Sequence, residues 1–185
     1  MRHMQVLVGV ALSAALSINV YAASPEPTGS GDAAIWQHHQ ELIDYYGVTS
    51  SYTCTGIEDR MRELLKYLGA RPDMKITPLC SSQSAPMQQV FVRVDFYSLA
   101  PASQGTADAT AAHWVPLNIA PSDPLFRDRA ECELFQNVKN LITKDFTVRD
   151  VRYTTTCTPN QTTLQDYKVT GEILAPPELQ RASAR

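Results

Sequence analysis

Four cysteines divide much of the chain into two stretches of the same construction. Each stretch reads as a cysteine, an amphipathic helical pattern, a short strand, a second cysteine and a longer alternating strand. The first covers residues 54–96 and the second residues 132–173. Because apolar phase and cysteine position agree in both, we interpret the chain as one unit used twice.

A nearly constant offset relates the two stretches. Adding 77 carries Cys80 onto Cys157, whereas Cys54 and Cys132 are 78 apart, which indicates one residue lost near the start of the second helix. The alternative is that two segments of similar rhythm fall into phase by chance. At an offset of 77, the paired helix residues are Ile57 with Leu134, Met61 with Val138, Leu64 with Leu141, and Leu65 with Ile142.

The pattern predicts an α+β fold of two pseudo-repeated Cys–helix–strand–Cys–strand units. Each unit forms an antiparallel hairpin, and the helices pack on one side. Between Asp32, a suitable N-cap, and Gly47, apolar residues recur at roughly helical spacing, which predicts a further, N-terminal helix at 33–46. Two helices are expected at 55–68 and 129–144, and strands at 74–79, 89–99, 113–119, 147–157 and 164–174.

Single residues mark expected boundaries and edges. Gly69 is the expected C′ residue of the first repeat helix, and Pro116 predicts an edge position for its strand. The expected organisation is a flexible lead-in at 23–32, a first repeat with its N-terminal helix at 33–100, a linker at 101–112, a second repeat at 113–175 and a mobile tail at 176–185.

Residues 1–22 have the composition of a cleavable signal peptide. Arg2 supplies positive charge, residues 6–20 are apolar, and Ala22 fits a small-residue cleavage site before Ala23. The apolar run is too short to span about 30 Å of hydrocarbon as a helix. We therefore expect export to the periplasm, or to the extracellular space, and no membrane span after cleavage; an uncleaved anchor is the alternative.

The charge balance disfavours nucleic-acid partners. Sixteen Lys and Arg stand against nineteen Asp and Glu, for a net charge of −3. The basic residues are scattered among the acidic ones, whereas phosphate neutralisation requires clustered cations.

Export determines how the cysteines are interpreted. In an oxidising compartment four cysteines form two disulfides. Each unit places one cysteine at the start of its helix and the other at the end of the strand that returns along it, so we predict Cys54–Cys80 and Cys132–Cys157. Each closed loop would contribute about 3 kcal/mol in the chain-entropy account.

Evidence for catalysis is scarce. The only histidines after residue 22 are His38, His39 and His113, and no Gly-x-Ser-x-Gly motif is present. An exported hydrolase or thiol-redox enzyme, with a site assembled from distant residues, is the alternative to a binding protein. It would gain support if His39 or His113 lay beside a Ser, Thr or carboxylate in a pocket.

The sequence also gives little support for metal or cofactor binding. Adjacent His38 and His39 diverge on a helix and do not easily share one ion, and Ile57 stands where a C-x-x-C motif would place a second thiol. No cofactor is expected, although a metal-binding envelope protein is a further alternative. The glycosylation sequon at Asn160 is interpreted as chance.

These observations favour a non-catalytic exported protein that binds an unknown envelope protein or a small ligand between its two repeats. Phe91 and Tyr97 lie on the polar side of an alternating strand; we favour their being covered by the N-terminal helix over their forming a contact surface. For every candidate aromatic, core packing is the competing interpretation. The candidate ligand or partner residues are Trp36, His39, Tyr45, Tyr46, Tyr52, Phe91 and Trp114.

Overall fold

The computed structural model describes residues 31–46, 52–80, 89–121, 132–157 and 166–182, without the side chains of 132, 133 and 180–182. All of these residues belong to one unit, residues 31–185. The expected signal peptide, most of the lead-in and Asn160 lie outside the described residues.

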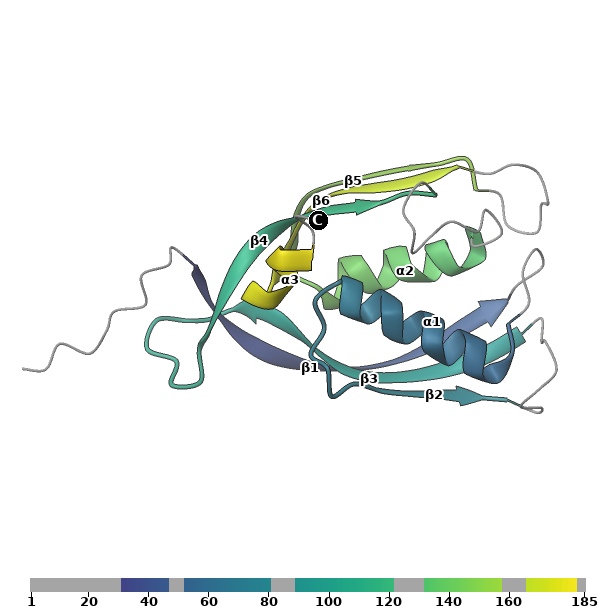
Figure 1. The fold of residues 1–185 in the computed structure, drawn as a ribbon, viewed down its shortest axis with the longest axis horizontal. Helices are drawn as coiled ribbons and strands as arrows, with labels where there is room; N and C mark the ends of the chain where they lie inside the picture. Colours follow the sequence, from purple (N-terminus) through teal and green to yellow (C-terminus); the bar gives the residue numbers. More distant parts are fainter. Residues whose placement is uncertain (1–30, 47–51, 81–88, 122–131, 158–165, 183–185) are drawn as a thin grey trace, which may run out of the picture. The chain divides into compact units, whose positions relative to one another are not determined.

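Six antiparallel strands form one sheet, so the α+β class is confirmed. The strand order is β2-β3-β1-β4-β6-β5 (Figure 1). The elements are β1 (Asp32–Tyr46), α1 (Cys54–Tyr67), β2 (Lys75–Leu79), β3 (Gln89–Pro101), β4 (Thr110–Ile119), α2 (Cys132–Asp145), β5 (Val148–Thr155), β6 (Tyr167–Ala175) and α3 (Pro177–Ala182).

The prediction of an N-terminal helix is wrong, because these residues form β1. This strand pairs with β3 over its whole length from Ala34 to Tyr46. Near its end Ile43 and Tyr45 are buried while Leu42, Asp44 and Tyr46 are exposed, which is the alternation of a strand with one covered face. Long-range pairing has overridden a local spacing that fits a helix equally well.

The order strand–helix–strand–strand occurs twice along the chain. We call residues 32–101, with β1, α1, β2 and β3, the first half, and residues 110–175, with β4, α2, β5 and β6, the second half. In the sheet, β2-β3-β1 of the first half mirrors β5-β6-β4 of the second. The predicted linker at 101–112 is the β3–β4 connection, and its last three residues belong to β4.

Only a short seam joins the halves through the sheet. β1 pairs with β4 at three positions, from Asp32–Ala112 to Ala34–Thr110. Beyond this seam, β4 pairs on its other side with β6. The predicted edge position is wrong for the strand as a whole, because β4 lies between β1 and β6 in the sheet order. Pro116 is tolerated because it lies outside the seam, where its missing N–H disrupts no pairing with β1.

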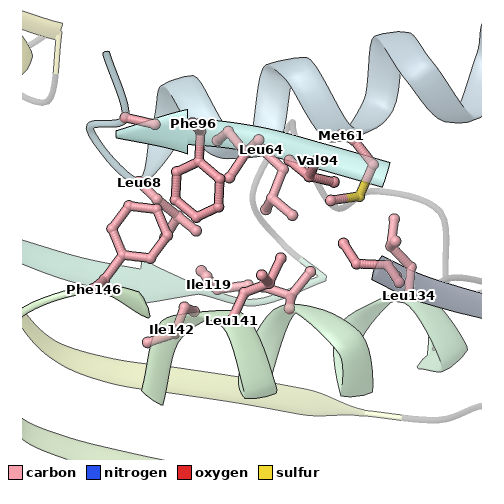
Figure 2. Close-up of a cluster of buried hydrophobic side chains, with 14 of the residues drawn as sticks. Met61, Leu64, Leu68, Val94, Phe96, Ile119, Leu134, Leu141, Ile142 and Phe146 are labelled. Carbon is pink, nitrogen blue, oxygen red and sulfur yellow. The ribbon is translucent and has the colours of Figure 1, made fainter. Parts of the chain in front are cut away.

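Both halves contribute to one hydrophobic core. α1 and α2 lie between the β1, β2 and β3 strands and the β4, β5 and β6 strands (Figure 1). In Figure 2, side chains of the two helices converge with those of β3 and β4. The labelled core residues are Met61, Leu64, Leu68, Val94, Phe96, Ile119, Leu134, Leu141, Ile142 and Phe146.

A second, smaller apolar cluster lies at the seam. Ala34, Leu99, Ala112 and Leu174 are buried there, with two partly buried tryptophans packed against them. The two tryptophans have similar neighbours: the Arg71 guanidinium carbon is 5.8 Å from the Trp36 ring centre and that of Arg149 is 4.2 Å from the Trp114 ring centre. These cation–π contacts help to cover the seam.

The Cys54–Cys80 disulfide is confirmed. It ties the first residue of α1 to the residue after β2, as the antiparallel return of the chain predicts. Thr53 caps α1 by accepting a hydrogen bond from the Gly56 amide at 3.1 Å, and Gly69, with a φ of 83°, follows its last turn as predicted.

The second predicted disulfide is only partly described. Cys157 is disulfide-bonded. Because the side chain of Cys132 lies outside the described part, the Cys132–Cys157 pairing stays a prediction.

The two hairpins differ in register. Ile76 pairs with Val94 in the first half, whereas Tyr153 pairs with Val169 in the second, two residues from the position that the offset of 77 predicts. β5 contains an irregularity between Arg149 and Arg152. A Cβ added at Gly171, which stands where the first half has Val94, would lie 3.0 Å from the Arg149 carbonyl oxygen, so this glycine admits the bulged strand.

The C-terminal segment contains a short helix. Residues 177–182, predicted to belong to a mobile tail, form α3. Leu179 packs against the shared core, and its Cδ2 atom would lie 3.4 Å from a Cβ added at Gly69. Apolar contact therefore holds this helix against the end of α1.

A shared core predicts one cooperative unfolding transition. Truncating Leu64 of α1 or Leu141 of α2 to Ala should lower the free energy of unfolding by about 2–5 kcal/mol in each case, because each change opens a cavity in the same core. Urea titrations followed by circular dichroism and by tryptophan fluorescence would measure it. Two separate transitions, each moved by only one of the substitutions, would contradict a shared core.

Candidate functional site

We call the surface of β1, β2 and β3 that faces away from α1 and α2 the outer face. No described helix covers it (Figure 1). Alternation brings every second residue of the three strands onto this face, and the register places Phe91 of β3 between Leu79 of β2 and Asp44 of β1.

Four large apolar side chains of the outer face are exposed. Phe91 is directly opposite Leu79, and Leu42 and Tyr46 flank Asp44, its partner on the other side. Diagonal neighbours on one sheet face are within reach of large side chains, so the four form one cluster. This cluster, named the apolar patch, consists of Leu42 (59% exposed), Tyr46 (49%), Leu79 (47%) and Phe91 (39%).

The expectation that a helix covers Phe91 and Tyr97 is wrong, since that segment is β1. Tyr97 is instead partly shielded by Arg71, whose guanidinium carbon lies 3.7 Å from the ring centre, and by His38, with ring centres 4.8 Å apart. Phe91 has no such shield among the described residues. It is therefore part of a surface.

The carboxylates of the outer face already have partners. Asp44 accepts hydrogen bonds from the Gln89 amide at 3.0 and 3.3 Å. Asp95 accepts from His38 at 2.8 Å and from Gln40 at 3.0 Å. These hydrogen bonds, that of His38 foremost, lower the pKa of Asp95, so it is fully ionised at neutral pH.

Two cations of the same face lack such partners. Arg93 stands between Leu42 and Thr77, and Lys75 is opposite Asp95. Neither forms a hydrogen bond or an ion pair within 4.0 Å with any other part of the described chain. The outer face therefore combines exposed apolar groups with unpaired positive charge.

The matching surface of the second half is polar. Under the offset of 77, Leu79 and Phe91 correspond to Thr156 and Lys168. Within the described second half, no large apolar side chain is as exposed as those of the apolar patch. The patch therefore distinguishes one half of the molecule from the other.

The structure separates the residues that the sequence proposed for a site. Tyr46 and Phe91 lie in the apolar patch, and Trp36 and Trp114 border the seam cluster. Tyr45 is fully buried, and its ring centre is 5.4 Å from that of Tyr52, so both belong to the core side of the molecule. These aromatics do not line a common cleft between the halves.

His39 belongs to a buried polar cluster with Ser98 and Asp145. Its Nε2 is 2.9 Å from the Ser98 hydroxyl, and its Nδ1 is 3.5 Å from Asp145 Oδ1. The ring stacks on Phe96, with centres 5.2 Å apart. Ser98 and Asp145 are only 2% and 5% exposed. The residue types match those of a serine hydrolase.

The hydrogen-bond directions differ from those of a hydrolase. The Ser98 hydroxyl donates to the backbone carbonyl of Asp145 at 2.6 Å, so its oxygen must accept from His39 Nε2–H. A catalytic histidine carries its proton on the nitrogen that faces the carboxylate and accepts the serine proton on the other. Buried Ser98 instead caps the last turn of α2, which is a structural role.

Burial is the main cause of the shifted pKa values of Asp145 and His39. It raises the pKa of the Asp145 carboxyl to about 6, with Glu41 adding to the rise and Lys144 opposing it. Burial also lowers the pKa of the His39 imidazole. Asp145 Oδ2 has no hydrogen-bond partner among the described residues, which is consistent with a carboxyl that resists ionisation.

Sequence reasoning missed Leu42, Leu79 and Arg93 as surface residues. Leu42 was assigned to a helix, and the position of Leu79 beside Phe91 depends on strand register. Ser98 and Asp145 were missed because their proximity to His39 requires β1, β3 and α2 to be placed together. The sequence offered one indication of this surface. Leu79 is apolar although the alternation of its strand places it on the exposed side.

The described residues contain no group of three His, Cys, Asp or Glu side chains suited to a metal ion. Of the helices among them, none has the length and apolar character needed to cross a membrane. No protein-family model, curated protein or solved structure matches the chain.

The raised pKa of Asp145 predicts that the free energy of unfolding depends on pH. Its ordinary value is 3.8, so between about pH 4 and 6 the folded state binds more protons than the unfolded state, and stability falls across that range and levels off above it. The D145N variant should lack this loss and gain up to about 3 kcal/mol over wild type between pH 4 and pH 8. Urea titrations across this range would measure the difference, and parallel pH profiles would contradict the assignment.

Proposed function

We propose that this chain is a non-catalytic exported protein that binds another protein through the apolar patch. The observation that carries this proposal is the concentration of four exposed large apolar side chains on one uncovered sheet face. Such a cluster, rimmed by polar residues, is typical of a protein contact surface.

The patch favours a protein over a small ligand. Small-molecule sites are concave and enclose most of their ligand, whereas Leu42 and Tyr46 are each about half exposed on an open strand surface. The space between the halves is a less suitable location, because α1 and α2 fill it with the shared core. The partner surface is therefore the outer face of the first half.

Export is supported by two features. Residues 1–22 have the composition of a signal peptide, and the Cys54–Cys80 disulfide fits an oxidising compartment such as the periplasm. N-terminal sequencing of the exported protein would locate the cleavage point. The partner is then a protein of the cell envelope.

Duplication of one strand–helix–strand–strand unit accounts for the fold. The mirrored strand order supports it, and so do two residue pairs that lie before the first cysteine of each unit, 78 positions apart, and share both identity and location. In this account one copy acquired the apolar patch and the other kept a polar surface. The two pairs are Ala34 with Ala112 and Trp36 with Trp114.

Site-specific crosslinking tests the proposed surface. A photoreactive phenylalanine analogue in place of Phe91 should give a discrete protein adduct when the cells that export the chain are irradiated. The same analogue at Lys168, the matching exposed position of the second half, is the control and should give little or none. The adducts would be compared on denaturing gels.

Comparison with the Lys168 control also defines the results that would contradict the proposal. Equal adducts at Phe91 and Lys168, or none at Phe91 in a protein that is exported and folded, would exclude the apolar patch as the partner surface. A Leu42→Ser change should reduce the Phe91 adduct, because it removes the most exposed member of the patch while leaving the core intact.

A further inference from the structure

We infer that the partner presents a carboxylate set among large apolar side chains, and that Arg93 receives this carboxylate. This inference rests on the proposed function and specifies the chemistry of the partner. Arg93 stands in the row next to Phe91, directly opposite Leu42 on β1 and Thr77 on β2. A group that lies on the patch is therefore within reach of its guanidinium.

The local charges favour an anionic group. Arg93 and Lys75 have no hydrogen bond or ion pair with other described residues, whereas Asp44 and Asp95 are occupied by Gln89, His38 and Gln40. A partner cation would meet acids that are already hydrogen-bonded. A partner carboxylate would meet an unpaired guanidinium that can bind it through two parallel hydrogen bonds.

Exclusion of water strengthens the contact between Arg93 and the carboxylate of the partner. Docking of an apolar segment on Leu42, Leu79 and Phe91 would exclude water from the neighbouring arginine. A charge-assisted hydrogen bond gains strength in that environment, and an arginine left without an anion there would oppose binding. The patch and Arg93 thus select jointly for one class of segment.

An anionic membrane surface fits less well. Basic patches that hold lipid headgroups contain several clustered cations, whereas this chain has a net charge of −3, and the unpaired cations of the outer face among the described residues are Arg93 and Lys75. The same surface also carries Asp44 and Asp95. We therefore assign the site to an acidic, apolar protein segment.

Selection of random peptides displayed on phage, against the whole exported protein, tests the inference. The enriched peptides should contain Asp or Glu beside Leu, Phe or Tyr. A synthetic consensus peptide would then be titrated by fluorescence anisotropy into wild type and into the R93Q, R152Q and F91S variants. Arg152 is the matched control, because it is an exposed arginine of β5 in the second half.

The expected result is a loss of affinity of about tenfold or more in R93Q and no change in R152Q. Replacing the peptide's acid by its amide should weaken binding to wild type by a similar factor and cause little further loss in R93Q, as a double-mutant cycle requires. F91S should also lose affinity, because it truncates the apolar anchor.

Each contrary outcome has a separate meaning. Peptides that need Phe91 but lack acids, or equal affinities for R93Q and R152Q, would overturn the role of Arg93 and leave the proposed surface standing. Selected peptides that bind F91S as tightly as wild type would overturn both proposals. Arg93-dependent binding to anionic phospholipid vesicles, without acidic peptides, would assign the surface to membrane instead.

Discussion

The packing of two helices against one side of a shared sheet determines what this molecule can present to a partner. α1 and α2 meet in a single core, to which β3 and β4 contribute from opposite halves (Figure 2). A site between the halves would have to displace this core. The available sheet surface is the outer one, where an exposed apolar side chain is not needed for folding.

The two halves share a topology but not an outer surface. Their strand orders mirror each other across a seam of three residue pairs, and a tryptophan with an arginine beside it covers the seam on each side. Away from the seam, apolar Leu79 and Phe91 have polar counterparts in the second half. Folding requirements common to both halves therefore do not account for the apolar patch, which is why we propose a binding role for it.

The sequence predicted the parts of the fold that depend on local pattern. The buried residues of α1 recur at helical spacing, and the cysteines at its start and after β2 form the expected disulfide. β1 was missed because its apolar residues fit helical spacing too, and only its pairing with β3 decides between the two. With β1 recognised as a strand, each half begins with a strand, and the order strand–helix–strand–strand occurs twice along the chain.

The candidate site was only partly predictable. Tyr46 and Phe91 were identified as aromatics, but the patch also depends on register, which brings Leu79 opposite Phe91. Arg93 is one scattered cation in the sequence and becomes notable only because the neighbouring acids have other partners. The His39 cluster shows the converse: three residue types typical of catalysis meet, yet their hydrogen-bond directions indicate a structural role.

The most direct test of the central claim is hydroxyl-radical footprinting of the chain in its native envelope extract and as the purified protein. Oxidation of Leu42, Leu79 and Phe91 would be quantified by mass spectrometry, with Trp114 of the second half as an internal reference. We expect the three patch residues to be protected in the extract and Trp114 to be oxidised equally in both. Equal oxidation of the patch in both preparations, or protection of the second half instead, would contradict the account.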